Sequence, residues 1–465
     1  MSREGAGLTI LDGDGGGTGL RITNSHSVVE GFTLRNFWTG VSCTEFGENE
    51  TPFRPEIRNC IIQNNDGTGI SVSGNCSAII ENNTILSNLY YGIDIEKLIQ
   101  SSVNPVIITN NIIEDHNRGI RLRGWQTAMI ENNQFKGGDW GIEILGNTGA
   151  EIRINTFQLH AADAIRIYYT SGVHPSVILG NTISGCLFGI QTDASGSITI
   201  QNNTLTNNLG GIFLMLGNNG SGNALVSNNT ITGSTQAGGI MARPGSGCLS
   251  FQCTISGNTL TNNNNESNGG GGISCFTSTV GTVQIIGNTL DGNKSFNGGG
   301  VYASGNVEVK NNQILNNMAT YGGGLNAVEG AVVVENYFES NSATTSGGGL
   351  ECRDAVIRDN TFLSNSATLN GGAVYSPYAS LISGNTFNSN YAGNNGGAIF
   401  GRATNWNATE VVTVSGMPRT VPRHFPCFNE TSNVYTGNTH GAATGEWGPG
   451  TDNWCANSGF NVYSN

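Results

Sequence analysis

The strongest constraint on the fold is an asparagine that returns every 22 to 30 residues, followed by one further residue and then a hydrophobic one. The members of this asparagine column are Asn59, Asn83, Asn111, Asn133, Asn155, Asn181, Asn203, Asn229, Asn258, Asn288, Asn312, Asn336, Asn360 and Asn385. A second column, a Gly or Ala before an aliphatic residue, keeps the same period, for example at Gly92-Ile93 and Gly141-Ile142. Two columns that stay in step over most of the chain indicate an internal structural repeat.

Each repeat contains short runs in which apolar and polar residues alternate, as in Ile93-Asp94-Ile95-Glu96. This alternation predicts strands with one buried face. A unit this short has no room for a crossover helix and cannot bury its own apolar face, so successive units must stack. We therefore predict an all-β fold, a single right-handed parallel β-helix of about fifteen coils with neighbouring strands about 4.8 Å apart. The stacked asparagines are expected to bond to one another at the bend between sheets.

The repeat divides the chain into three predicted regions. Residues 1–250 read as coils with short turns, and residues 251–403 as coils of the same solenoid that carry Gly-Gly and Phe-x-x-Asn repeats. From Thr404 the period is no longer visible, and residues 404–465 are predicted to form an irregular C-terminal cap that shields the last sheet edge. Three tryptophans in this tail, Trp406, Trp447 and Trp454, are expected to fill the core of the cap.

Charge and hydropathy exclude several classes of partner. The net charge is −13 and no basic run is present, which argues against nucleic acid. No apolar stretch approaches the roughly 18 residues that a membrane helix needs. The first residues lack the order of a signal peptide, so we expect the chain to begin within a longer protein. Ten cysteines, many Asn-x-Ser/Thr sequons and few lysines are typical of an exported protein, so we predict an extracellular or cell-surface location.

The cysteines leave the disulfide pattern open. Cys275 and Cys352 occupy one column but lie three coils apart, roughly 14 Å at the strand spacing, which is too far for a bond. The pairs Cys248 with Cys253 and Cys427 with Cys455 are the plausible bridges. Four further cysteines are interpreted as small buried residues: Cys43, Cys60, Cys76 and Cys186.

The late coils carry a family resemblance. Phe338-Glu339-Ser340-Asn341 and its two successors alternate with Gly347-Gly348-Gly349-Leu350, Gly371-Gly372-Ala373-Val374 and Gly396-Gly397-Ala398-Ile399. This pattern resembles the paired Phe-x-x-Asn and Gly-Gly-Ala-Ile repeats of the chlamydial polymorphic membrane proteins, which implies an adhesin-like surface protein. The rest of the chain resembles the wider right-handed parallel β-helix, or pectin-lyase-like, superfamily. That superfamily also contains polysaccharide lyases, epimerases and glycoside hydrolases, so a carbohydrate-active enzyme is the alternative.

A group of charged residues marks the candidate site. If the residue after each Gly-Ile or Ala-Ile pair points outward, adjacent coils present Asp94, Arg121, Glu143 and Arg166 in one column. Two residues further on, the same coils present Glu96, Arg123, Leu145 and Tyr168. The surrounding sequence is rich in aromatic and ionisable residues, namely Tyr90, Tyr91, Lys97, His116, Trp125, Trp140, His160 and Tyr169.

Three interpretations of this group stay open: a salt-bridged ladder that only solvates the sheet, a glycan-binding face, and a catalytic site. For binding, aromatic rings would stack on sugars and arginines would pair with carboxylate or sulfate groups, with Tyr91, Arg123, Trp125, Trp140 and Tyr168 as the expected ligand contacts. The partner would be a polysaccharide, a cell-surface glycan or a surface protein. The loops near residues 90–170 are short, and this favours binding over catalysis.

For catalysis, the candidates are Asp94, Arg121, Glu143 and Arg166. Asp94 and Glu143 lie two coils apart, about 9.6 Å at the strand spacing, near the carboxyl separation of inverting glycosidases. Arg121 between them should hold both carboxylates ionised and leave the site without an acid. Tyr91-Gly92-Ile93-Asp94 resembles the start of the Tyr-Gly-Phe-Asp-Pro-His motif of mannuronan epimerases, but Ile95 and Glu96 replace the Pro-His.

No cofactor is required by these readings, and calcium is the one metal considered. Asp12 and Asp14 lie in an Asp-Gly-Asp-Gly turn that could present carboxylate and carbonyl oxygens to a hard cation. No cysteine or histidine pair has the spacing of a zinc site.

Overall fold

The computed structural model describes residues 9–23, 26–44, 53–97, 104–124, 127–146, 148–169, 175–194, 196–266, 269–277, 281–378, 380–402, 409–414, 417–422, 434–440 and 453–456. These residues form strands and turns and no helix. They fold as a right-handed parallel β-solenoid of about fourteen turns, which confirms the predicted all-β fold. The contacts divide the chain into two compact units, which we describe separately.

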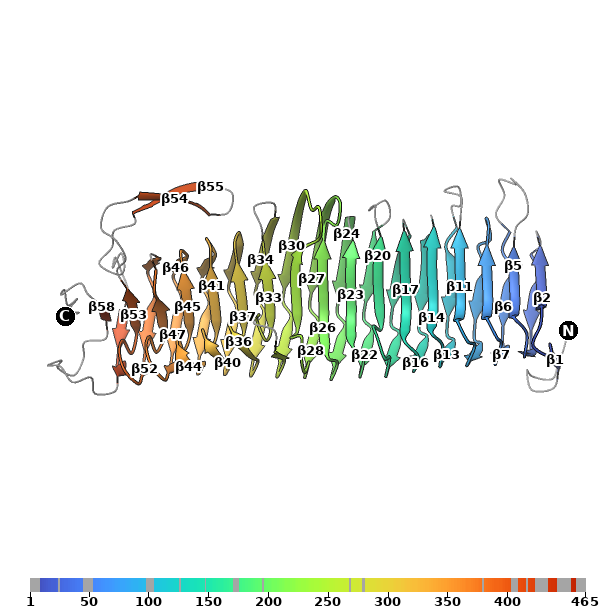
Figure 1. The fold of residues 1–465 in the computed structure, drawn as a ribbon, viewed down its shortest axis with the longest axis horizontal. Coiled ribbons are helices and arrows are strands. Elements are labelled where there is room, and N and C mark those ends of the chain that lie inside the picture. Colours follow the sequence, from blue (N-terminus) through green and yellow to red (C-terminus); the bar gives the residue numbers. More distant parts are fainter. Residues whose placement is uncertain are drawn as a thin grey trace. The chain divides into compact units, whose positions relative to one another are not determined.

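The N-terminal unit comprises Met1–Asn208, Ile212–Ala224 and Gly245–Leu249, and each of its coils contributes one strand to each of three parallel sheets (Figure 1). Sheet A contains β1 (Ile10–Asp12), β4 (Thr33–Arg35), β7 (Ile61–Gln63), β10 (Thr84–Leu86), β13 (Ile112–Glu114), β16 (Gln134–Lys136), β19 (Thr156–Gln158), β22 (Thr182–Ser184) and β25 (Thr204–Thr206). Sheet B contains β2 (Thr18–Thr23), β5 (Thr39–Thr44), β8 (Thr68–Ser73), β11 (Tyr91–Lys97), β14 (Arg118–Gly124), β17 (Trp140–Gly146), β20 (Ile165–Tyr169) and β23 (Phe188–Ala194). Sheet C contains β3 (Val28–Glu30), β6 (Glu56–Arg58), β9 (Ile79–Glu81), β12 (Val106–Thr109), β15 (Thr127–Glu131), β18 (Gly149–Arg153), β21 (Ser176–Leu179) and β24 (Gly196–Gln201).

The C-terminal unit comprises Leu209–Gly211, Leu225–Pro244 and Ser250–Asn465, so the division falls within β26 (Gly210–Leu216) and β27 (Ser221–Ser227). Its sheet A strands are β28 (Thr230–Thr232), β31 (Thr259–Thr261), β35 (Thr289–Asp291), β39 (Gln313–Leu315), β43 (Tyr337–Glu339), β47 (Thr361–Leu363), β51 (Thr386–Asn388) and β56 (Val434–Thr436). Its sheet B strands are β29 (Ile240–Pro244), β33 (Ile273–Phe276), β37 (Val301–Ser304), β41 (Leu325–Val328), β45 (Leu350–Arg353), β49 (Val374–Ser376), β53 (Ile399–Arg402) and β58 (Asn453–Ala456). Its sheet C strands are β30 (Ser250–Ser256), β34 (Gly281–Ile286), β38 (Val307–Lys310), β42 (Val332–Val334), β46 (Val356–Arg358) and β50 (Leu381–Ser383).

A fourth parallel sheet is present in the C-terminal unit. Its short strands are β32 (Asn264–Asn265), β36 (Lys294–Asn297), β40 (Met318–Tyr321), β44 (Ser342–Ser346), β48 (Ser366–Ala367), β52 (Tyr391–Ala392) and β57 (Thr439–His440). They lie just before the Gly-Gly segments of the sequence repeat, so the change of sequence signature after residue 250 coincides with an added strand in each coil.

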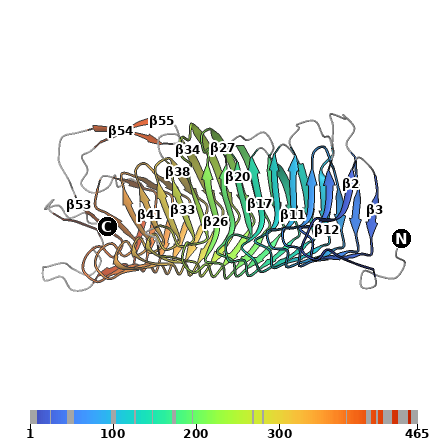
Figure 2. The ribbon, with the colours of Figure 1, turned by 45° about the vertical axis from the view of Figure 1, so that its right-hand side comes forward.

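The register follows the sequence repeat. Ile93 pairs with Ile120, which pairs with Ile142, and all three side chains are fully buried. In sheet A the inward column contains phenylalanines that stack on one another, with ring centroids 4.6 Å apart for Phe135 and Phe157. Figure 2 shows the resulting succession of parallel strands along the solenoid, with β11, β17 and β20 following one another in sheet B. The core therefore consists of identical or similar side chains stacked coil upon coil.

The asparagine column forms the predicted ladder. The Asn83 side-chain amide donates to Asn111 Oδ1 at 3.0 Å, and Asn111 donates in turn to Asn133 Oδ1 at 2.9 Å. Each rung also receives the backbone N–H of the preceding rung, as Asn111 Oδ1 does from Asn83. Asn59 was assigned to this column wrongly, because Cys60 occupies the position and its N–H donates to Asn83 Oδ1. The error is one residue, since Asn59 has φ 52° and forms the turn before the column.

A second ladder runs at the next bend, which leads from sheet A into sheet B in the N-terminal unit and into the fourth sheet in the C-terminal unit. In the C-terminal unit its asparagines are consecutive, and Asn317 donates to Asn341 Oδ1, which is followed by Asn365. In the N-terminal unit Asn65 and Asn88 begin the same ladder, but His116 then takes the asparagine position and receives the Asn88 N–H on Nδ1. In the N-terminal unit this second ladder stabilises the bend that leads directly into sheet B.

The predicted C-terminal cap contains more regular structure than expected. The described residues after 408 include an antiparallel hairpin of β54 (Thr409–Val414) and β55 (Met417–Pro422). They also include a further coil, because β56, β57 and β58 pair in parallel with β51, β52 and β53. Asn438 extends the second ladder by accepting from Asn390. Trp406, Trp447 and the side chain of Trp454 lie outside the described residues.

The predicted burial of four cysteines is confirmed, because the following side chains are buried: Cys43, Cys60, Cys76 and Cys186. Cys275 and Cys352 are three strands apart in one column, as predicted. The predicted bridge between Cys248 and Cys253 is wrong, because neither sulfur takes part in a disulfide. Cys427 and the side chain of Cys455 lie outside the described residues.

Candidate functional site

The outer surface of sheet B in the N-terminal unit carries three columns of polar and aromatic side chains over β11, β14, β17 and β20. We call this surface the charged face. Its first column contains Tyr91, Arg118, Trp140 and Asp163, its second contains Asp94, Arg121, Glu143 and Arg166, and its third contains Glu96, Arg123, Leu145 and Tyr168. The second and third columns have the predicted register. The first column brings Arg118 and Asp163 into the site, which the sequence analysis missed because it counted outward positions only after the Gly-Ile or Ala-Ile pair.

The charged face is closed around Asp94 on β11 and Arg121 on β14. The Arg121 guanidinium binds the Asp94 carboxylate in a bidentate pair, with Nε and Nη2 each 2.8 Å from a carboxylate oxygen. The guanidinium carbon lies 3.8 Å from the centre of the Tyr91 ring, and Nη1 donates to the Tyr91 hydroxyl. Arg123 approaches the same carboxylate and binds Glu96 at 2.6 Å. Because these groups satisfy one another and the Arg121 side chain is only 15% exposed, this end is structural.

Arg118 provides the pairing that the sequence analysis assigned to Arg121. Its Nε donates to Glu143 Oε2, and its guanidinium carbon lies 4.5 Å from the centre of the Trp140 ring. Glu143 is buried under this contact. The two carboxylates therefore have different arginine partners, Asp94 with Arg121 and Glu143 with Arg118. The role of these carboxylates in catalysis stays a prediction.

The charged face is open over β20. Arg166 Nη1 lies 3.8 Å from Asp163 Oδ2, a longer contact than those of Arg121, and the Arg166 side chain is 34% exposed. The guanidinium carbon lies 6.0 Å from the centre of the Trp140 ring, and the exposed ring of Tyr168 lies on the same strand. This end combines an accessible cation with two aromatic side chains, which is the combination that can receive an anionic ligand.

Asp163 has the most perturbed carboxyl group of the charged face. Its side chain is 3% exposed, and this burial raises its pKa to about 6, against the opposing effects of Arg166 and of Trp140. The charge of Glu143 raises the pKa further. A carboxyl with this pKa can hold a proton near neutral pH, but its burial keeps it away from a ligand on the surface.

The two histidines expected near the site lie inside the fold. His116 forms part of the second ladder, with Nε2 3.1 Å from the Ile85 carbonyl oxygen, and burial lowers its pKa. His160 is also buried, 6.2 Å from the Phe157 ring centre, and burial lowers its pKa to about 4. Neither imidazole reaches the outer surface, so neither can act on a ligand there. Trp125 and the side chains of Lys97 and Tyr169 lie outside the described residues.

The structure gives the calcium prediction no support. Both carboxylate oxygens of Asp12 have protein partners, with Arg35 Nε at 2.8 Å and Asn36 Nδ2 at 2.9 Å. These hydrogen bonds, that of Asn36 first, lower the pKa of Asp12. Asp14 lies in the following turn at φ 50°. In the part of the chain that the structure describes, no three His, Cys, Asp or Glu residues gather in a way that could hold a metal ion.

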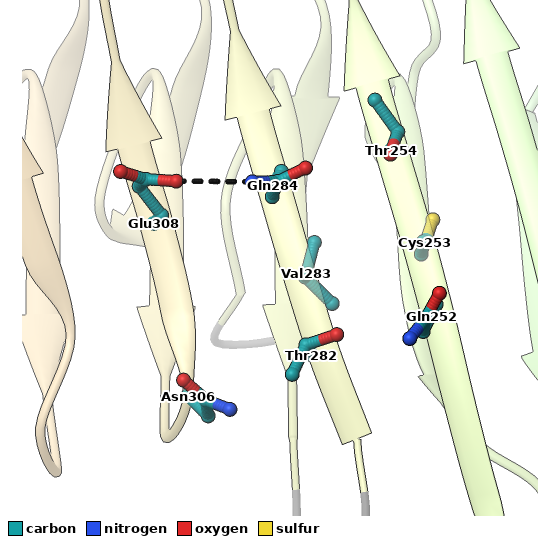
Figure 3. Close-up of a pocket in the computed structure, with 8 residues that line it drawn as sticks. All are labelled: Gln252, Cys253, Thr254, Thr282, Val283, Gln284, Asn306 and Glu308. Carbon is teal, nitrogen blue, oxygen red and sulfur yellow. Dashed lines mark hydrogen bonds between the residues drawn. The ribbon is translucent and has the colours of Figure 1, made fainter. Parts of the chain in front are cut away.

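A shallow hollow of about 300 Å³ lies on the outer surface of sheet C in the C-terminal unit. Figure 3 shows it across three neighbouring strands, β30, β34 and β38, with Gln284 donating to Glu308 at 3.1 Å. Its outer lining consists of Gln252, Thr254, Thr282, Gln284, Asn306 and Glu308. These side chains are polar and short, and the hollow lacks aromatic residues and arginines, so the charged face remains the stronger candidate.

Comparisons with known proteins agree with the fold. Residues 97–258 match the model of the right-handed β-helix region, and residues 12–164 match the model of the periplasmic copper-binding protein NosD. A search of curated proteins found none with significant similarity. Among solved structures, the crystal structure of bacteriophage CBA120 tailspike protein 3 aligns over 91% of this chain at 10% identity with a TM-score of 0.22. The chain spans 57% of the length of that tailspike.

Fold and matches together define a right-handed parallel β-helix repeat protein. The resemblance of the late coils to chlamydial surface proteins stays a prediction. The described residues do not fit the copper site that the second family description implies, because His116 is bonded to backbone atoms and no suitable metal cluster exists among them. No helix that could cross a membrane occurs in the described ranges.

Proposed function

We propose that this chain is an exported β-helix protein that binds an acidic glycan on the charged face without changing it chemically. The observation that carries the proposal is Arg166, an exposed guanidinium with one long ion pair to a buried carboxyl, set between Trp140 and Tyr168. A uronate carboxylate or a sulfate would give this cation a closer partner than Asp163 does. The periplasmic family that matches residues 12–164 supports export.

Two features weigh against chemistry at this face. The carboxyl groups of Asp94 and Glu143 are each bound to an arginine, so neither is placed to act as a base on a ligand. The carboxyl that could donate a proton, Asp163, is buried beneath Arg166. General acid–base catalysis requires a group within hydrogen-bond reach of the substrate, and Asp163 is not in reach of the surface.

Asp163 also favours the second candidate function, a carbohydrate-active enzyme. Its pKa of about 6 is typical of a general acid, and Glu143 lies on the neighbouring strand. A ligand that displaced Arg166 would uncover this carboxyl. The enzyme would then use Asp163 as the acid, with Asp94, Arg121, Glu143 and Arg166 as the surrounding polar groups.

A binding assay on immobilised glycans separates the two candidates. Wild type and Arg166→Ala are compared on polyuronates, sulfated glycans and neutral glycans, and ultraviolet absorbance is read for unsaturated uronate products. The matched control is Arg58→Ala, because Arg58 is 35% exposed and ion-paired but lies on the outer surface of sheet C.

We expect wild type and Arg58→Ala to be retained on one acidic class and Arg166→Ala to lose about tenfold or more in affinity, in line with the loss of a charge-assisted contact. Retention on uronates alone would identify carboxylate as the recognised group, and retention on sulfated glycans alone would identify sulfate. Equal retention of Arg166→Ala and wild type would refute the site. Product formed by wild type and not by Asp163→Asn would replace the binding proposal with the enzyme.

A further inference from the structure

A pair of aromatic rings is exposed on the N-terminal unit just before sheet B begins in its coils. Trp38 is 54% exposed and Tyr90 is 45% exposed, in a chain whose apolar side chains mostly point into the solenoid. Leu89 beside Tyr90 is also exposed. We call these three residues the aromatic shelf. Exposed apolar side chains that are grouped in this way are typical of interaction sites, whereas single ones need no explanation.

The position of the shelf is fixed by the backbone. Hydrogen bonds between successive coils place Trp38, Gly67 and Tyr90 in one row, since the Trp38 carbonyl accepts from Thr68 and the Gly67 carbonyl accepts from Tyr90. The indole of Trp38 lies over Gly67, where a Cβ atom would come within 3.1 Å of Trp38 Cε2. The Tyr90 ring meets the Trp38 ring edge-on with centroids 6.0 Å apart. Both rings are therefore held in place before any ligand binds.

The shelf continues into the charged face. The Tyr90 and Tyr91 ring centres lie 6.4 Å apart, and Tyr91 lies under the Arg121 guanidinium. From there the alternation of rings and guanidinium groups runs through Arg118 and Trp140 to Arg166. The connected surface therefore crosses the coils from β5 to β20, all within the N-terminal unit.

We propose that the aromatic shelf is a second subsite for the same glycan, which lies across the coils with sugar rings on Trp38 and Tyr90 and an acidic group on Arg166. This inference rests on the proposed function. Tyr90 and Arg166 are three strands apart, about 14 Å at the strand spacing, so the ligand is a chain of several sugars. The Trp38 and Tyr90 ring centres are only 6.0 Å apart, so the two rings together contact one end of that chain.

The surroundings of the shelf favour a sugar chain over a protein surface. The row that contains Trp38 and Tyr90 continues with Asn117 and Asp139, whose side chains bond to each other and retain further acceptor capacity for hydroxyl groups. A stable protein interface needs roughly 1,000 Å² or more with an apolar centre. Two rings and one leucine bordered by amides and carboxylates are too small for that and sufficient for a narrow polar chain.

The test measures affinity against ligand length. Acidic oligosaccharides of increasing length, of the class retained by wild type, are titrated calorimetrically into wild type, Trp38→Ala, Tyr90→Ala, Arg166→Ala and Tyr391→Ala. Tyr391 is the control, because its ring is 47% exposed but lies in the fourth sheet of the C-terminal unit. Circular dichroism and thermal unfolding verify that each variant is folded.

We expect the affinity of wild type to rise with length until the chain spans both subsites. Trp38→Ala and Tyr90→Ala should lose this rise, up to about tenfold per ring, and keep wild-type affinity for the shortest ligands. Arg166→Ala should lose affinity at every length, and Tyr391→Ala at none. Wild-type behaviour of Trp38→Ala and Tyr90→Ala at all lengths would overturn the shelf and leave the Arg166 site standing. Loss in the two ring variants with none in Arg166→Ala would support the shelf and overturn the anionic site.

Discussion

The two units build sheet B from the same repeat but use its outer surface differently. In the C-terminal unit the second outward column runs through Ser274, Tyr302, Asn326, Glu351 and Tyr375, and three of these five side chains are buried. Glu351 is bound by Arg353 at 2.8 Å and fully covered. In the N-terminal unit the same column contains Arg166, which remains accessible. The added strands of the fourth sheet accompany the covered column, whereas the three-sheet coils bury Asp94 and Glu143 and leave the charged face open at β20.

The second asparagine ladder, inside the solenoid, also differs between the two units. The second ladder of the C-terminal unit begins with Ser234, whose N–H donates to Asn263 Oδ1, and continues as asparagine through Asn263, Asn293, Asn317, Asn341 and Asn365. The ladder of the N-terminal unit is interrupted by His116, His160 and Cys186, and the two histidines lie two and three residues before Arg118 and Asp163 of the first outward column. These two departures from the repeat inside the solenoid thus fall in coils that carry the charged face. A regular repeat specifies the scaffold, and the irregular coils are where a site is expected.

The largest expected effect is the loss of a rung in the regular ladder. Asn341→Ala removes an oxygen that accepts two hydrogen bonds from Asn317 and an amide that donates to Asn365 and to the Ile314 carbonyl. Several buried groups lose their partners, so we expect the free energy of unfolding to fall by about 4 kcal/mol. Chemical denaturation measures the change. Gln313→Ala, at an exposed position of the preceding coil, should stay within about 0.5 kcal/mol of wild type, and an equal effect of both variants would contradict the ladder's role.

The second prediction concerns His160→Asn, which places an asparagine at an interrupted position of the second ladder. The folded-state pKa of His160 is about 4, below its ordinary value of 6.5, so its contribution to stability is present above pH 6.5 and is lost as the pH falls through 4. The loss amounts to about 3 kcal/mol. We expect His160→Asn to be more stable than wild type by this amount near pH 4 and close to wild type at pH 7. Denaturation midpoints across this range measure the difference, and a pH-independent difference would refute it.

The third prediction concerns Asp163, whose pKa is shifted in the opposite sense. The folded-state pKa of about 6 lies above the ordinary 3.8, so the protonated carboxyl stabilises the fold below pH 3.8 and this stability is lost as the pH rises through 6. The loss is about 3 kcal/mol. Asp163→Asn should therefore be more stable than wild type at pH 7 and equal to it near pH 3.5. The same variant frees Arg166, so glycan affinity at pH 7 should rise, and unchanged stability at pH 7 would exclude a buried, ionised Asp163.

The prediction with the smallest expected effect compares the loss of stability at the two ends of the charged face. Arg121→Ala leaves Asp94 partly buried without its bidentate partner, so we expect a loss of about 2 kcal/mol. Arg166→Ala removes a long ion pair between a partly exposed guanidinium and the buried Asp163, whose carboxyl can take up a proton, and should cost less than about 1 kcal/mol. Thermal unfolding at neutral pH measures both. A stability loss for Arg166→Ala as large as for Arg121→Ala would show that both ends are structural and would remove the basis for a binding site at β20.

The sequence by itself determined the architecture and most of the register. The asparagine and Gly-Ile columns specify which residues stack. The asparagine amides at the bends form their hydrogen bonds with the equivalent amides of the neighbouring coils, so the coils must align with the asparagines in register. Asp94, Arg121, Glu143 and Arg166 were placed in one column for the same reason. The miscount at Asn59 arose because Cys60 fills an asparagine position, which no pattern of residue types marks.

Tertiary structure alone decided how the charges are paired and which groups stay accessible. The sequence pattern places Arg121 between two carboxylates, but side-chain length and the neighbouring aromatic rings direct Arg121 to Asp94 and Arg118 to Glu143. The sequence pattern also cannot distinguish a histidine that points outward from one that belongs to the ladder. His116 and His160 lie inside because their imidazoles replace asparagine amides at the bend. The aromatic shelf depends on Trp38 folding over Gly67 in the next coil. Such contacts join residues about 30 positions apart through side-chain conformation, and the repeat specifies only the backbone that carries them.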